Sequence, residues 1–216
     1  MENKIYSLFT VIVLLMASCR FAIVPSYVKK QSYNFRNIPK RDNLYLNKTG
    51  YYFRDGRYDN YSIFFFKNNI CAKTFLGRDK NEIEQRIKSM QDDVNHYIYI
   101  GDVNVYWGTY SLSNDTIKTI MVNRPSFMSP TWMPIEEWYV ILDSVTIKRT
   151  AYEWILDSVP SLRKRIFLEN KQEEIQHLQF IPNIPDYNNS WILKYKWFWK
   201  NEDEYIEWMK FHKIKK

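Results

Sequence analysis

Cys19 is the residue whose chemistry is best defined by the sequence around it. Residues 8–16 read L-F-T-V-I-V-L-L-M, an uncharged run that is followed by Ala17 and Ser18 and then by this cysteine. The run is too short to cross a bilayer, which takes roughly 20 apolar residues. It has the length of the apolar region of a signal peptide, and small residues suit a peptidase site. We therefore expect cleavage before Cys19 and modification of its thiol.

Residues 15–19, L-M-A-S-C, resemble the lipobox of bacterial lipoproteins, in which the cysteine is lipidated and becomes the first residue. The resemblance implies a signal peptide over residues 1–18 and acyl chains on Cys19, which would anchor a domain at about 0.8 kcal/mol per buried CH₂. An ordinary cleaved signal peptide and a short N-terminal anchor are the alternatives. Arg20 stands where an inner-membrane retention signal has aspartate, which implies an envelope protein in the outer membrane, facing the periplasm.

The other residues that could do chemistry lack the spacing for it. His96, His177 and His212 are scattered, and no pair of cysteines accompanies them, so no metal site is indicated. Phosphate-binding loops and nucleophile motifs are absent from the sequence. Glu136 and Glu137 are neighbours, but adjacent residues on a strand point to opposite faces and cannot share acid–base work. We expect a non-enzymatic protein without a metal or cofactor.

The composition is aromatic and basic. Aromatic residues make up 18% of the chain, which indicates either a β-rich core or an aromatic-lined cavity. The net charge is +7, but basic and acidic residues are interleaved through most of the chain. Outside the cytoplasm, an anionic membrane surface is a better counter-charge for such a chain than nucleic acid. One segment is biased, and residues 19–43 are predicted to be a lipid anchor and basic tether because of Lys29, Lys30, Arg36, Lys40 and Arg41.

From about residue 44 the pattern is typical of β-strands. Short turn signals separate the first strands, which predicts a meander followed by a hairpin. Cys71 lies in the apolar stretch I-C-A-K-T-F and is expected to be buried rather than reactive. Residues 161–180 allow either a helix or a strand. The predicted strands are 49–53, 61–66, 70–75, 106–112, 116–123, 138–148 and 191–199.

Two segments have helical patterns. Ile83, Ile87 and Met90 recur at helical spacing, which predicts a helix over 81–90. The C-terminus has acidic residues after Asn201 and lysines at its end, an order that complements a helix dipole. This helix could pack on the β core or lie on a membrane surface. The fold class is therefore mainly β with minor α: an antiparallel lipocalin-like barrel or curled sheet, as a single domain over 44–216, with one internal and one C-terminal helix.

Residues 107–117, W-G-T-Y-S-L-S-N-D-T-I, resemble a hairpin of the small lipocalin-like lipoproteins of Bacteroidetes. The stretches G-Y-Y-F-R-D-G and S-I-F-F-F-K-N-N are similar to the opening strands of the same group. The likeness covers about residues 44–150 and the Trp-rich end. It implies a lipocalin-like barrel. Most members of the group have no assigned activity, so the likeness implies no functional residue.

These observations favour a lipid-anchored envelope protein that binds a small apolar ligand or a partner protein through its β domain. The predicted ligand contacts are the aromatic side chains Trp107, Tyr110, Trp191 and Trp197. Glycan binding by exposed aromatic residues is the alternative. An enzyme would need a polar cleft that the sequence does not indicate. The expected partners are the membrane, through the lipid, and a small apolar ligand, a glycan or an envelope protein, but no nucleic acid.

Overall fold

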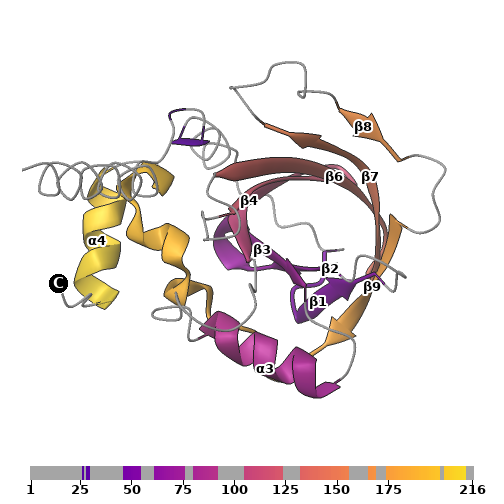
Figure 1. The fold of residues 1–216 in the computed structure, drawn as a ribbon, viewed down its shortest axis with the longest axis horizontal. Helices are drawn as coiled ribbons and strands as arrows, with labels where there is room; N and C mark the ends of the chain where they lie inside the picture. Colours follow the sequence, from indigo (N-terminus) through magenta and orange to yellow (C-terminus); the bar gives the residue numbers. More distant parts are fainter. Residues whose placement is uncertain are drawn as a thin grey trace, which may run out of the picture.

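The described part of the chain forms an antiparallel β-barrel with helical segments packed outside it (Figure 1). The computed structural model describes residues 26, 28–29, 46–54, 61–75, 80–91, 105–123, 132–155, 165–168, 174–199 and 202–212. Within these ranges eight antiparallel strands close the barrel. The predicted mainly β class with minor α is confirmed, and of the two predicted forms the structure is the barrel rather than the curled sheet.

Most strands pair with their neighbours in sequence, as the predicted meander requires. The first seven are β1 (Gly50–Phe53), β2 (Tyr61–Phe65), β3 (Ile70–Phe75), β4 (Tyr106–Ser113), β5 (Thr116–Asn123), β6 (Met133–Asp143) and β7 (Thr146–Trp154). β9 (Ile175–Phe180) lies between β7 and β1 and closes the barrel, with Leu178 opposite Tyr52 and His177 opposite Thr146. β8 (Ile166–Phe167) pairs with β7 beyond β9, at Ala151 and Tyr152.

Asparagine makes the tight turns at one end of the barrel. Asn68 and Asn69 have φ angles of 63° and 60° in the short 3-10 segment η1 (Lys67–Asn69), and Asn114 has a φ of 52° between β4 and β5. Asparagine tolerates this left-handed geometry better than most residues. The turns predicted at Asn68-Asn69 and at residues 113–115 are confirmed.

The predicted strand over 138–148 is wrong in one respect, because the chain reverses inside it. β6 ends at Asp143 and β7 begins at Thr146. The carboxylate of Asp143 accepts a hydrogen bond from the backbone N–H of Val145 at 2.8 Å, which stabilises a tight turn without glycine or proline. The apolar residues on both sides hid this turn in the sequence.

The two predicted helices are confirmed, and a predicted strand is not. α3 (Lys80–Gln91) and α4 (Glu202–His212) lie outside the barrel (Figure 1). Residues 191–199 were expected to form a strand but fold as the 3-10 segments η5 (Trp191–Lys194) and η6 (Lys196–Phe198), after η4 (Tyr187–Asn189). Aromatic residues favour half-buried surfaces of any kind, so their β propensity was misleading here. The ambiguous stretch 161–180 contains strands β8 and β9 in its described part.

Two apolar cores lie on opposite faces of the barrel wall. The inner core fills part of the barrel, and the outer core lies between the wall and the helical segments. Gly108 lets β4 and β5 approach each other closely, because a Cβ at this position would lie 1.9 Å from the carbonyl oxygen of Ile120. The outer core includes Trp107, Trp132, Trp191, Ile192, Leu193, Phe198 and Trp208.

Only Ser26, Val28 and Lys29 are described within the predicted tether. Val28 is buried in the outer core, so at least this residue packs on the domain. Cys19 and the predicted signal peptide lie outside the described residues, and lipidation and the domain boundaries stay predictions.

Candidate functional site

The two ends of the barrel differ in their connections. At one end, β2–β3, β4–β5 and β6–β7 turn within a few residues. At the other end, which we call the mouth, the connections from β1, β3, β5 and β7 to the next strand cover residues 54–60, 76–105, 124–132 and 155–165. Side chains that point into the barrel near its mouth form the candidate site.

Aromatic rings fill the interior away from the mouth. The ring of Phe65 lies 5.8 Å from that of Tyr52, 5.1 Å from that of Tyr110 and 6.4 Å from that of Tyr139, measured between centroids. All three contacts are edge-to-face, a favourable geometry for aromatic pairs. All four side chains are buried, and the Tyr110 hydroxyl donates to the carbonyl of Phe66 at 2.9 Å. This half of the barrel is therefore packed core.

Nearer the mouth, five charged side chains form a continuous network that we call the charged floor. Glu137 Oε1 lies 2.6 Å from Lys73 Nζ and 2.7 Å from Arg149 Nη1. Arg149 Nε lies 2.7 Å from Glu174 Oε2, and Arg54 Nη1 lies 2.9 Å from Glu174 Oε1. These residues come from β3, β6, β7, the residue after β1 and the residue before β9, so only the closed barrel brings them together.

Glu137 is the centre of the charged floor. Burial alone would raise the pKa of its carboxyl, but the charges of Lys73 and Arg149 and hydrogen bonds from Lys73 and Tyr139 outweigh burial and lower this pKa to about 2. Burial lowers the pKa of Lys73, and Glu137 opposes that change. Burial would raise the pKa of Glu174, but Arg149 and Arg54 lower it. Both carboxylates are therefore charged at neutral pH.

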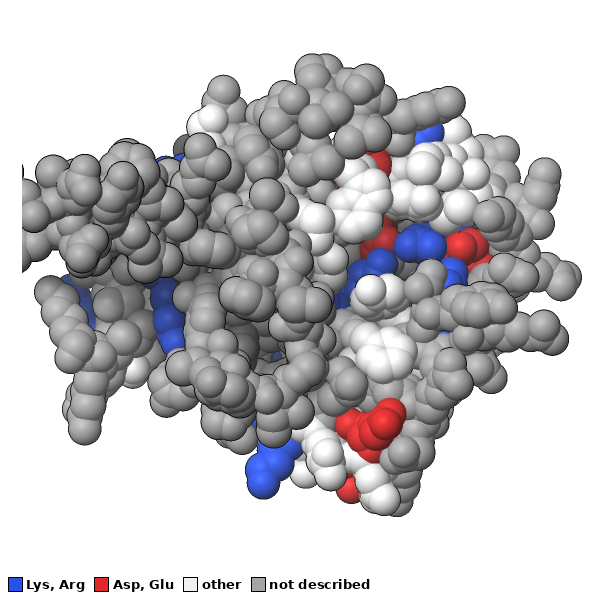
Figure 2. All heavy atoms as spheres, in the orientation of Figure 1, with Lys and Arg blue, Asp and Glu red and all other residues white. Residues whose placement is uncertain are grey.

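Among the described residues, the charged floor contains more cations than carboxylates. Its three cations, Arg54, Lys73 and Arg149, face two carboxylates, Glu137 and Glu174. The side chains of the cations are 14%, 10% and 15% exposed, so they reach solvent, whereas Glu137 is fully buried. Figure 2, which has the orientation of Figure 1, shows basic and acidic side chains together in a recess over the barrel.

Aromatic side chains surround the charged floor, and we call them the aromatic collar. They share the inward faces of their strands with inner-core residues, as Tyr61 does with Ile63 on β2. The ring of Tyr61 lies 4.9 Å from Lys73 Nζ, and the ring of Tyr152 lies 5.2 Å from Arg149 Cζ. Most collar rings are only partly buried, and the collar comprises Tyr61, Phe75, Tyr106, Tyr152 and Trp154.

Two amides on inward-facing positions have hydrogen-bonding groups without a partner among the described residues. Asn123, on the mouth end of β5, is 2% exposed, and its Nδ2 has no partner. Gln176, on β9, is 5% exposed, and its Oε1 has none. Asn123 follows Met121 of the inner core by two residues, so it faces the interior. Buried polar groups without partners are rare in proteins, and a ligand can supply the missing group.

Glu136, the neighbour of Glu137, makes a similar ion pair on the other face of the wall. Its Oε1 lies 2.6 Å from Lys118 Nζ, and Lys118 lies over the outer ring of Trp138 at 5.2 Å. Burial raises the pKa of Glu136, with Lys118 opposing, whereas the pKa of Glu137 is lowered. The prediction that the two carboxylates point to opposite faces is confirmed.

The four predicted ligand contacts do not form one site. Tyr110 lies inside the barrel, in the packed half. Trp107, Trp191 and Trp197 lie with the outer core, where Trp107 is 0% and Trp191 4% exposed and Trp197 is partly buried. The indole of Trp132 lies between Trp191 and Trp197, 5.9 and 6.5 Å away. Trp107 and Trp191 thus present no exposed ring to a sugar, and ligand contact by all four stays a prediction.

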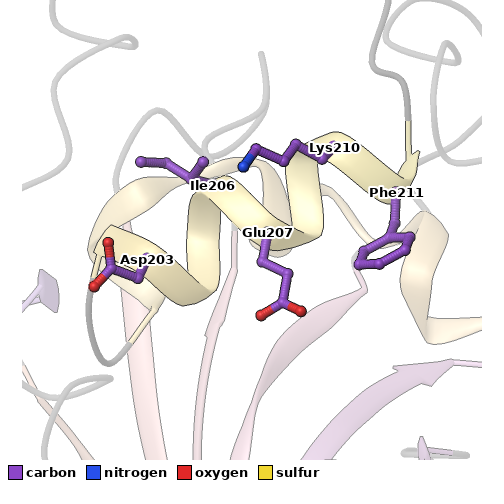
Figure 3. A pocket seen from close by; sticks show the side chains of 5 residues that line it. All are labelled: Asp203, Ile206, Glu207, Lys210 and Phe211. Atoms are coloured by element: carbon purple, nitrogen blue, oxygen red, sulfur yellow. The ribbon is translucent and has the colours of Figure 1, made fainter.

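A second concave surface lies on α4, outside the barrel. Its lining is Asp203, Ile206, Glu207, Lys210 and Phe211, and Figure 3 shows Ile206 and Lys210 along one edge with Glu207 and Phe211 directed away from them. Ile206 is 41% and Phe211 77% exposed. This groove mixes both signs of charge and has no buried polar group directed into it, so it is the weaker candidate.

Comparison with known proteins does not assign a function to this site. No family model, no curated protein and no solved structure matches the chain. Among the described residues, no cluster of histidine, cysteine and carboxylate side chains could hold a metal ion. No described helix is both long and apolar enough to span a membrane.

The charged floor was not predicted from the sequence, although the sequence contains a signal for it. Lys73 shares the inward face of its strand with Cys71, and Glu137 shares that of β6 with Ile135 and Tyr139. A single charge at an inward position of an apolar alternation is unusual and needs a partner. The paired residues lie up to 120 positions apart in the chain, so identifying the partners requires the strand register.

Proposed function

We propose that this chain is a lipid-anchored, non-enzymatic protein of the bacterial envelope whose barrel binds a small ligand at its mouth. The single observation that supports this function is the contrast between the two halves of the barrel. One half is packed with aromatic rings, and the other ends in partly exposed aromatic rings around charged side chains. Ligand pockets commonly combine aromatic walls with a few polar groups that fix orientation.

The proposed place of the protein follows from the lipobox-like residues 15–19. Acylation of Cys19 would hold the barrel at the outer membrane on the periplasmic side, within reach of small molecules that enter the envelope. Metabolic labelling with a fatty-acid probe tests this anchor. The native chain should take up the label and Cys19→Ala should not, and equal labelling of both would refute the anchor.

Binding at the mouth is tested with the neutral apolar probe N-phenyl-1-naphthylamine, whose fluorescence increases in apolar surroundings. The full chain should bind the probe saturably, at one site. Trp154→Ala removes a collar ring and should weaken binding several-fold. The matched control is Trp138→Ala, because Trp138 is also partly buried but lies on the outer face of the neighbouring strand.

A further control addresses the groove on α4. Phe211→Ala removes the most exposed apolar side chain of that groove and should leave probe binding unchanged. Saturable binding that is lost in Phe211→Ala and kept in Trp154→Ala would refute the proposed location. The absence of saturable binding both of this probe and of its sulfonated analogue 1-anilinonaphthalene-8-sulfonate would refute ligand binding itself.

A further inference from the structure

The cations of the charged floor point to one chemical class of ligand, and this step rests on the proposed function. We propose that the ligand is a small organic anion, a carboxylate, sulfonate or phosphate ester, whose anionic group contacts Lys73 and Arg149 and whose apolar body lies among the collar rings. The charged floor has three cations for two carboxylates, and all three cations reach solvent.

Among the described residues, the two proposed contacts have hydrogen-bond donors to spare. The ammonium of Lys73 has three N–H donors and makes one hydrogen bond, to Glu137. Arg149 uses Nε on Glu174 and Nη1 on Glu137, which leaves Nη2 for a further acceptor. Both side chains are held in place by these ion pairs, so they are oriented before an anion arrives. Such preorganisation lowers the cost of binding.

Asn123 provides an independent observation. Its amide Nδ2 is a buried donor on the inward face, without a partner, and a ligand oxygen would satisfy it. The described inward face thus offers three donors, an ammonium, a guanidinium nitrogen and an amide nitrogen, beside one unpartnered acceptor, the Oε1 of Gln176. A ligand with several acceptor oxygens matches the three donors, whereas a hydrocarbon would leave them without water and without partners.

A neutral ligand and an anionic one are distinguished by how they meet the spare N–H donors of Lys73 and Arg149. A neutral apolar body would displace water from these donors without replacing its hydrogen bonds, which is unfavourable. The oxygens of an anion would accept hydrogen bonds from these donors. The collar contributes to both kinds of ligand, because any aromatic or aliphatic body can pack against its rings.

The test compares two probes that share an anilinonaphthalene body. 1-Anilinonaphthalene-8-sulfonate carries a sulfonate, and N-phenyl-1-naphthylamine lacks it. At low salt the full chain should bind the sulfonate about tenfold more tightly, in line with one partly solvated ion pair. Equal affinity for the two probes would overturn the anion inference and leave the proposed ligand site intact, and binding of neither would overturn both.

Two variants change the charge of the floor in opposite directions. Lys73→Met removes one positive charge and one of the two proposed contacts, and it should remove the preference for the sulfonate with little change for the neutral probe. Glu174→Gln removes the negative charge that pairs with Arg149 and should strengthen sulfonate binding several-fold. If Lys73→Met does not fold, as circular dichroism would reveal, Glu174→Gln decides the question, because a merely structural role predicts no gain.

Lys118→Met is the matched control for Lys73→Met. Lys118 also pairs with a glutamate of β6 at 2.6 Å and lies over an aromatic ring, but on the outer face of the barrel. This variant changes the net charge of the whole protein by the same amount and should leave both affinities unchanged. A loss of sulfonate binding in Lys118→Met equal to that in Lys73→Met would overturn the inference, because it would show only a long-range effect of net charge.

Discussion

Replacing Glu137 by glutamine should destabilise the barrel far more than replacing Glu136 by glutamine. Glu137 is fully buried and lies within 2.7 Å of Lys73 and Arg149, so the change leaves two largely buried cations without the carboxylate that they share. Removing one member of a buried ion pair costs about 3–5 kcal/mol. The pKa gives a similar figure, because a carboxyl at about 2 instead of 4.5 is stabilised by about 3 kcal/mol. The Glu136→Gln substitution should lower the free energy of unfolding by less than about 1 kcal/mol, because the partner Lys118 is 35% exposed.

The assay is urea unfolding followed by tryptophan fluorescence at pH 7 and again at pH 3. The folded pKa of Glu137 lies below its unfolded value, so its stabilisation is complete above about pH 5 and is lost as the pH falls toward 2. The gap between the two variants should therefore shrink by about 2 kcal/mol at pH 3. Equal stability of Glu137→Gln and Glu136→Gln at pH 7, or a gap that does not change with pH, would refute the reasoning.

Three further predictions concern the inner wall. Tyr139→Phe removes the 2.7 Å hydrogen bond to the Glu137 carboxylate and should cost about 2 kcal/mol in the same urea assay, and an unchanged midpoint would contradict it. Gly108→Ala places a Cβ against the backbone of Ile120 and should cost about 3 kcal/mol or more, so a thermal midpoint equal to that of the native chain would be inconsistent with the close approach. Cys71 is 0% exposed and burial raises its pKa, so iodoacetamide should label it only in urea, and fast labelling of the folded protein would argue against this burial.

Local patterns predicted most of the barrel wall. The asparagine turns, the alternation in the early strands and the helical spacing of Ile83, Ile87 and Met90 are local signals, and each corresponds to an element in the structure. Two kinds of segment misled the prediction. The chain reverses just after Asp143, between two apolar strands. Residues 191–199 form 3-10 segments, and their aromatic rings pack against the outside of the barrel.

The candidate site could not be predicted in the same way, because it depends on long-range pairing. Arg54 and Glu174 meet only because β9 closes the barrel beside β1. Glu137 was recognised in the sequence as one of two adjacent carboxylates, and its direction relative to Glu136 was correct. Which cations it meets followed from the register of β3 and β7, which no local pattern specifies. The four aromatic residues that were predicted as ligand contacts belong to the two cores or pack against them.

A crystal structure with 1-anilinonaphthalene-8-sulfonate tests the central claim most directly. The anomalous signal of the sulfonate sulfur locates the anionic group without assumptions about the rest of the probe. We expect this sulfur inside the mouth, with sulfonate oxygens within hydrogen-bond distance of Lys73 Nζ and Arg149 Nη2. A probe whose sulfur lies only on the α4 groove, with none inside the barrel, would contradict the account.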